Sequence, residues 1–182
     1  IGLTLALDPV HARNGGEAVA KRIIDECHNV YLEAIKDDDF FGLQCYSRRL
    51  AGPDGMLPIP EDAETTDMGW EFYPETLEDA IRDSAKIANI PMLVTENGVA
   101  ATDDSRRVEY IQRALAGVAL CINDGYNVMG YLYWSAFDNF EWSFGFAPRF
   151  GIIGANHQTQ ERTIRESAKY LGRIAQKNAL TI

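Results

Sequence analysis

A regular alternation between short apolar runs and amphipathic segments constrains the fold more than any other feature. Apolar runs fall at residues 1–7, 40–47, 90–95 and 128–134. Each is followed by a segment whose apolar residues recur at three- and four-residue spacing, which is typical of a helix with one buried face. We therefore predict strands over the four runs, and helices over residues 17–36, 76–88, 103–123 and 164–176.

Strands that alternate with helices along a chain are parallel and are joined by right-handed crossovers. The sequence therefore predicts an α/β fold, with residues 1–182 as one domain. The first apolar run is predicted to be a buried strand. Residues 8–16, 48–69 and 135–163 are predicted loops, and a loop as long as 48–69 is usually functional or mobile.

Charge and apolar content exclude several classes of protein. The net charge of -10 argues against a nucleic-acid partner, because phosphate binding requires an excess of Lys and Arg. No apolar run is long enough to span a bilayer, and no secretory signal pattern is recognised. Three widely spaced cysteines, Cys27, Cys45 and Cys121, are expected to be free thiols in a reducing compartment. We therefore expect a cytoplasmic protein without a nucleic-acid or membrane partner.

Motifs for metal, phosphate or Ser/His/Asp chemistry are not recognised. The three histidines, His11, His28 and His157, are scattered, and the cysteines form no zinc-binding pattern. The segment at residues 151–154 lacks the spacing of a glycine-rich phosphate loop. We expect no metal and no organic cofactor.

Glu96 is the most informative single residue. It follows the apolar run directly, and in parallel α/β folds the functional side chains lie at the carboxyl ends of the strands. A carboxylate in this position can act as a nucleophile or as an acid/base. It can equally be a loop carboxylate, with Gly98 serving the turn, and residue spacing does not separate these two interpretations.

A second group of candidate residues follows the fourth apolar run. Trp134 and Trp142 flank Glu141, and indole rings beside a carboxylate suit a sugar, whose apolar face packs on the ring while its hydroxyls donate to the carboxylate. The alternative is a set of core aromatic residues. Tyr46, at the end of the second run, could hydrogen-bond a strand-end carboxylate or serve only in packing.

Several of these segments resemble family 1 glycoside hydrolases, the retaining β-glucosidase and β-galactosidase family. Residues 95–98, Thr-Glu-Asn-Gly, resemble the nucleophile motif of that family. Residues 130–142 and 145–152 resemble its sugar-binding strand and loop, and residues 39–47 resemble its sixth strand. The matching segments keep their order over essentially the whole chain.

The resemblance implies a role for each candidate residue. Glu96 would be the nucleophile that forms a covalent glycosyl-enzyme, and Tyr46 would hydrogen-bond Glu96 and help to hold it ionised. Asn139 would support the sugar-binding loop, whereas Trp70 is expected to have only a structural role. Contacts to a β-glucoside or related sugar would come from Gln44, Trp134, Glu141, Trp142 and Phe150. Gln44 stands where the family commonly has Asn, so it keeps the amide on a longer side chain.

The resemblance covers the C-terminal half of the family's (β/α)8 TIM barrel, βα units five to eight. Residues 1–5 resemble the fifth strand, and a complete barrel typically needs about 250 residues. The family's acid/base is the Glu of an Asn-Glu-Pro motif on the fourth strand, and this sequence contains no Asn-Glu pair. A retaining glycosidase requires both carboxyl groups.

Half a barrel exposes two sheet edges that a closed barrel lacks. A separate N-terminal half could supply units one to four, two copies could pair into a dimer, or the chain could form an open four-stranded sheet. We expect the first: a β-glucosidase-like enzyme that is inactive as an isolated chain. The alternatives are a non-catalytic half-barrel that binds sugar weakly or only assembles, and an unrelated flavodoxin-like binding module.

Overall fold

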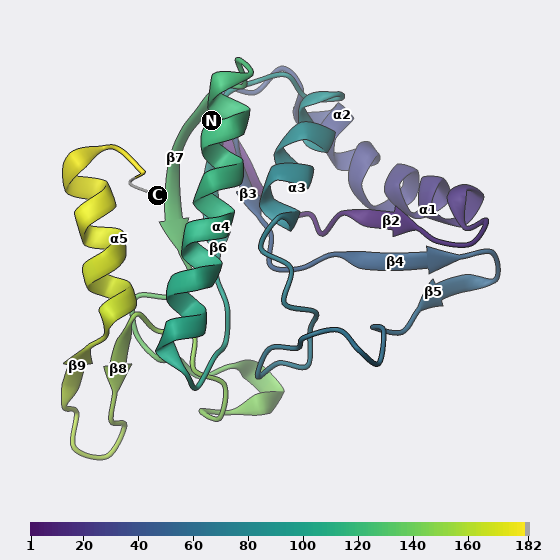
Figure 1. Cartoon of the computed structure of the whole chain (residues 1–182). Helices are drawn as coiled ribbons and strands as arrows, with labels where there is room; N and C mark the ends of the chain where they lie inside the picture. Colours follow the sequence, from purple (N-terminus) through teal and green to yellow (C-terminus); the bar gives the residue numbers. More distant parts are fainter. Residues whose placement is uncertain (181–182) are drawn as a thin grey trace.

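A four-stranded parallel sheet forms the centre of the computed structural model, which describes residues 1–180 (Figure 1). Its strands lie in the order β1 (Gly2–Ala6), β3 (Phe40–Gln44), β6 (Met92–Asn97) and β7 (Val128–Tyr133). Every neighbouring pair is parallel. The predicted α/β alternation is therefore confirmed, and strand order in the sheet follows strand order in the chain.

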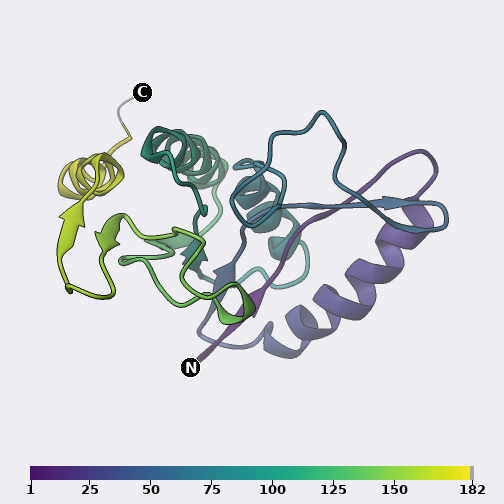
Figure 2. The same ribbon diagram turned by 90° about the horizontal axis from the view of Figure 1, so that it is seen from below.

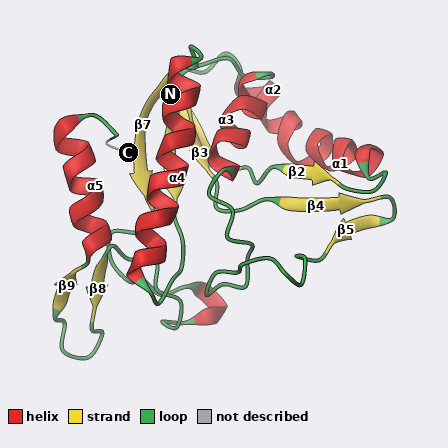
Figure 3. Cartoon of the chain, in the orientation of Figure 1, coloured by secondary structure: helices red, strands yellow, loops and turns green. Residues whose placement is uncertain are grey.

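Helices follow each strand of this sheet (Figure 3). They are α1 (Glu17–Ile24), α2 (Val30–Ile35), α3 (Thr76–Ala85), α4 (Asp104–Asn123) and α5 (Glu166–Lys177). The helix predicted over residues 17–36 is present, but a π-helical segment, η1 (Asp25–Asn29), separates α1 from α2. Within residues 1–180, no helix combines the length and the apolar character needed to cross a membrane.

The hydrophobic core lies between one face of the sheet and the helices. Viewed from below, the helices form an arc along that side (Figure 2). Phe41 and Leu43 of β3 and Val94 of β6 are fully buried against them. These three side chains share a face because alternate residues of a strand point the same way.

Two of the predicted loops contain short strands. β2 (Val10–Ala12), β4 (Arg49–Gly52) and β5 (Gly55–Leu57) form a second sheet that extends to one side of the molecule (Figure 1). The prediction of loops over residues 8–16 and 48–69 was wrong there. The Gly-Pro-Asp-Gly sequence at residues 52–55 is a turn signal, and it marks the β4–β5 hairpin.

The predicted loop 135–163 is also partly ordered. It contains the short helix η2 (Trp142–Phe144) and the strand β8 (Ile153–Ala155), which pairs with β9 (Arg162–Ile164). Strands of three residues are too short to show a hydrophobic period, so the sequence pattern did not reveal them.

β1 is paired but not buried, which corrects the prediction of a buried strand. Leu3 is 47% exposed, and Thr4 and Ala6 are also exposed. Among the described strands, β1 pairs only with β3 and β7 pairs only with β6, so each forms an edge of the sheet. The apolar run predicted the strand correctly, but burial also requires a neighbour on the second side.

The face of the sheet opposite the helices is open. Gly42 lies on this face, because a Cβ there would approach the Oγ1 of Thr4 to 2.6 Å and the Cγ2 of Thr95 to 2.8 Å. Leu132 is 53% exposed, whereas its neighbours Tyr131 and Tyr133 point to the other side of the strand and are partly buried. We call this face, with Thr4, Gly42, Thr95 and Leu132, the inner face.

Candidate active site

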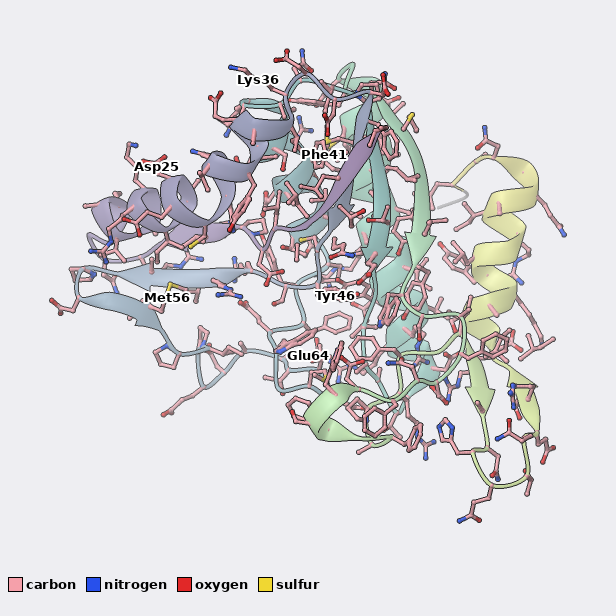
Figure 4. The ribbon with its side chains drawn as sticks, turned by 180° about the vertical axis from the view of Figure 1, so that it is seen from behind. Asp25, Lys36, Phe41, Tyr46, Met56 and Glu64 are labelled. Carbon is pink, nitrogen blue, oxygen red and sulfur yellow. The ribbon has the colours of Figure 1, made fainter. Side chains whose placement is uncertain are left out.

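Glu96 lies at the carboxyl end of β6 and receives two side-chain hydrogen bonds. The Nε2 of Gln44 donates to its Oε1 at 2.7 Å, and the hydroxyl of Tyr46 donates to its Oε2. Both donors come from the end of the adjacent strand β3. Figure 4 shows Tyr46 just beyond the tips of the strands, whereas Phe41 lies near their start. The sequence-predicted contact between Tyr46 and Glu96 is therefore present.

A shift in strand register brings these groups together. Leu43 pairs with Val94, but the next residue, Gln44, pairs with Glu96. This bulge places the Gln44 amide opposite the carboxylate instead of opposite Thr95. Bulges of this kind often re-aim side chains beside active sites.

Tyr46 remains protonated next to the carboxylate. Burial raises the pKa of Tyr46, and the hydrogen bond to Glu96 and the charge of Glu96 raise it further. The charge of Glu141 also raises the pKa of Tyr46. Tyr46 is thus a hydrogen-bond donor at neutral pH.

Three aromatic rings pack together beside Glu96. The Tyr46 ring lies 5.7 Å from the Trp70 ring and 6.1 Å, edge-on, from the Phe150 ring, while Trp70 and Phe150 are 6.3 Å apart. Phe150 is the buried member of this group, and its ring packs against the phenol that contacts Glu96. The structure therefore places Trp70 beside the candidate site, although only a structural role was predicted for it.

The remaining predicted sugar contacts lie on the segment after β7. Trp134 follows this strand, and its backbone N–H donates to the carbonyl of Asn97 at 2.9 Å; the Trp134–Ser135 peptide is cis. Asn139 donates from its Nδ2 to the Oε2 of Glu141 at 2.7 Å, in agreement with the supporting role predicted for it. Trp134 and Glu141 are both partly buried.

Trp142 lies apart from this group. It belongs to η2 and is 83% exposed, so it is not packed against the Glu96 cluster in the described chain. Phe140 and Phe144 on the same segment are also more than half exposed. These three rings form an exposed apolar rim on the segment after β7.

A cavity of about 360 Å³ opens beside Tyr46 and Trp70, against the β4–β5 hairpin. Its wall includes an ion pair in which Arg48 holds both carboxylate oxygens of Glu71, at 2.9 and 2.6 Å. The guanidinium of Arg48 also lies 3.8 Å from the centre of the Tyr73 ring. Figure 4 labels Met56 on this hairpin, to the side of Tyr46.

Sequence reasoning missed a buried polar layer behind Glu96. Asn97, the next residue in β6, donates from its Nδ2 to the carbonyl of Cys45 at 2.7 Å and to the hydroxyl of Tyr110 at 3.1 Å. The hydroxyl of Tyr131 donates to its Oδ1 at 2.9 Å. Regular alternation from the buried Val94 would turn Glu96 toward the helices, but the register shift before Glu96 breaks it, and Asn97 is buried there instead. Its partners are also distant in sequence.

Among residues 1–180, no three His, Cys, Asp or Glu side chains are grouped as metal ligands. The site contains a carboxylate held by two side-chain donors, a second carboxylate whose charge acts on Tyr46, and a group of packed aromatic rings. Such an arrangement can attack an electrophilic carbon and bind the hydroxyls and apolar faces of a sugar.

Comparison with known protein families identifies one family model. The model described as glycosyl hydrolase family 1 matches residues 30–180. The chain is 30% identical to β-glucosidase A of Thermotoga maritima over 195 aligned positions, covering 97% of this chain and 44% of that protein. It is 32% identical to a β-galactosidase of Sulfolobus acidocaldarius over 173 positions, covering 87% of this chain and 35% of the relative.

Solved structures of glycosidases also superpose on this chain. The crystal structure of β-glycosidase BGL167 superposes with a TM-score of 0.92 at 46% identity, covering 98% of this chain and 43% of that one. The chain therefore spans less than half the length of the relatives that it matches.

Proposed function

Because the chain belongs to glycosyl hydrolase family 1, and forms part of a (β/α)8 glycosidase fold, we propose that it is βα units five to eight of a retaining β-glycosidase. In this proposal the chain supplies the nucleophile, Glu96, and much of the sugar subsite. The N-terminal half of the barrel, on another segment or chain, supplies the acid/base.

The geometry of Glu96 carries this proposal. A retaining glycosidase needs a carboxylate oriented for attack, and the donors Gln44 and Tyr46 each hold one oxygen of Glu96. An oxygen of Glu96 would attack the anomeric carbon while the leaving oxygen takes a proton from the partner's acid. Water would then attack the same carbon, give its proton to that group, and release the sugar with retained configuration.

The open inner face argues for a partner half. In a complete barrel, layers of side chains from all strands fill the interior. Here Leu132 is half exposed on that face, and among residues 1–180 the outer edges of β1 and β7 have no paired strand. Units one to four would cover this face and both edges at once.

The sugar contacts proposed for this chain surround Glu96 on two sides. Trp134 and Glu141, with Asn139 holding the latter, would bind the face and hydroxyls of the sugar from the segment after β7. Trp142 would join them as part of the exposed rim. Gln44 bonds Glu96 directly, so its longer amide acts on the nucleophile in addition to any contact with sugar.

Complementation tests the proposal. The chain is mixed with an N-terminal half carrying units one to four, either its own or that of BGL167, and turnover of an aryl β-glucoside is followed. We expect turnover in the mixture and not with either half alone. Glu96→Gln should reduce turnover at least about a thousandfold, since the nucleophile is lost. Glu161→Gln, on an exposed carboxylate, is the matched control and should leave turnover unchanged.

Each other outcome decides against part of the proposal. Turnover by the chain alone would contradict the need for an acid/base from the N-terminal half. Assembly without turnover would favour a half-barrel that only binds sugar or assembles. A mechanism-based fluorosugar should label Glu96 in the mixture only, which mass spectrometry of the peptide reports.

A further inference from the structure

The buried layer behind Glu96 has no part in the chemistry described above. Its members, Asn97, Tyr110 and Tyr131, come from β6, α4 and β7, and Asn97 and Tyr110 are fully buried. Buried polar side chains are costly unless their hydrogen bonds are made, so a completely bonded set of this kind specifies one arrangement of the elements that carry it.

The direction of every hydrogen bond in this layer follows from the donors available. Tyr110 donates its hydroxyl proton to the backbone carbonyl of Tyr46 at 2.8 Å and accepts from the Nδ2 of Asn97. The second Nδ2 proton of Asn97 goes to the carbonyl of Cys45, and Tyr131 donates to the Asn97 Oδ1. Burial raises the pKa of both tyrosines well above the usual value, so both remain donors.

The two carbonyls that this layer holds lie at the end of β3, beside the donors to Glu96. Cys45 stands between Gln44 and Tyr46, and the N–H of Cys45 also donates to the carbonyl of Glu96 at 3.0 Å. The backbone that presents the amide and the phenol is therefore fixed from behind. Its position relative to the carboxylate depends on hydrogen bonds that do not touch the site.

We propose that Tyr110, acting through Asn97 and the Tyr46 carbonyl, is a positioning residue for the nucleophile. It sets where Tyr46 presents its hydroxyl to Glu96. This inference rests on the proposed function, because it concerns the carboxylate assigned there as nucleophile. Tyr110 touches neither the sugar nor the reacting atoms.

A double-mutant cycle in the complemented enzyme tests the inference. Tyr110→Phe keeps the ring and its edge-on packing against Phe72 at 5.6 Å but removes the hydroxyl. We expect kcat to fall about tenfold with KM changed less than about twofold, since a misplaced catalytic group costs rate more than binding. In a Tyr46→Phe background, the further loss on Tyr110→Phe should be less than about twofold, because the phenol being positioned is already absent.

The matched control is Tyr170→Phe in α5. The Tyr170 hydroxyl is buried and has no hydrogen-bond partner within the described residues, so its removal should change neither kcat nor the cycle. An unchanged kcat in Tyr110→Phe would overturn the inference. So would a loss of equal size in both Tyr46 backgrounds, since that result indicates a general structural effect.

Two further measurements separate failure of the inference from other failures. If Tyr110→Phe does not fold, Tyr131→Phe removes the donor to Asn97 and enters the same cycle. If the wild-type mixture shows no turnover, the proposed function fails. The side-chain amide resonances of Gln44, measured in the full chain, then test whether Tyr110 positions the end of β3. Tyr110→Phe should shift them and Tyr170→Phe should not; unshifted resonances would contradict the positioning role.

Discussion

At the scale of single residues, the candidate site depends on what surrounds Glu96 more than on Glu96 itself. The sequence predicted Glu96 as nucleophile and Tyr46 as its hydrogen-bond partner, and the structure places the two in contact. It adds the Gln44 amide on the second oxygen, at 2.7 Å. Since each oxygen has its own donor, the orientation of the carboxylate is fixed before any substrate binds.

Replacement of Gln44 by leucine tests this second donor. Gln44→Leu keeps the approximate volume but removes the N–H, so Glu96 loses one constraint on its orientation. In the complemented enzyme we expect kcat to fall at least about tenfold. Gln44→Asn is the matched variant, because it keeps the amide on a shorter side chain. Its kcat should lie between those of the wild type and Gln44→Leu. Equal kcat for Gln44→Leu and the wild type would show that the contact has no catalytic effect.

At the scale of elements, close packing between strand ends decides several residue identities. A Cβ at Gly98 would lie 1.9 Å from the carbonyl oxygen of Trp134, so only glycine fits where β6 and β7 converge. From the sequence, Gly98 was interpreted as a turn residue. Glycine is required at this position because of Trp134, which is 36 positions further along the sequence. No local sequence pattern around Gly98 contains that contact.

The segment after β7 is fixed by an ion pair that local patterns also did not reveal. Arg165, at the start of α5, donates to both oxygens of Asp138, at 2.9 and 2.7 Å. The N–H of Gly151 donates to the same carboxylate at 3.0 Å. Burial by itself would raise the pKa of Asp138, but the hydrogen bonds and charge of Arg165 and the backbone N–H groups lower it overall.

Asp138 is therefore expected to make stability depend on pH in the acid range. Its pKa is lower in the folded than in the unfolded chain, so its contribution is present above about pH 4 and is lost as the pH falls through the folded value. Asp138→Asn should lower the free energy of unfolding at pH 7 by about 3 kcal/mol, because it leaves the largely buried charge of Arg165 without its carboxylate partner. Urea unfolding from pH 7 to pH 3 checks this.

The difference between the wild type and Asp138→Asn should shrink as the pH falls through this range. Asp62→Asn, at an exposed position, is the matched control and should leave the unfolding curve unchanged at every pH. A constant difference from pH 7 to pH 3 would contradict the assigned role of the ion pair.

At the scale of the whole molecule, the inner face and the sheet edges indicate where a partner binds. The helices bury one face of the sheet, whereas the inner face and the outer sides of β1 and β7 have no partner within the described residues (Figure 2). Unpaired strand edges favour pairing with another chain. The proposed partner is the N-terminal half of the barrel.

A matched pair of leucines tests this assembly. Leu132 on the inner face and Leu120 on α4 are 53% and 51% exposed. Leu132→Asp places a charge where the barrel interior would close, so we expect it to abolish complex formation with the N-terminal half on size-exclusion chromatography. Leu120→Asp lies on the outer helix layer and should leave the complex intact. Equal assembly by both variants would contradict a barrel-like interface.

The sequence was enough to predict the α/β alternation, the strand that leads to Glu96, and the family. These features are local: apolar runs and helical spacing extend over a few residues, and residues 95–98 form a continuous motif. The three-dimensional arrangement was needed to show that β1 is exposed, that Trp70 lies beside Tyr46, and that Asn97 and Tyr110 hold the end of β3. Those outcomes depend on which distant segments come into contact. Burial and hydrogen bonding arise from such contacts, so the local sequence around a residue does not reveal them.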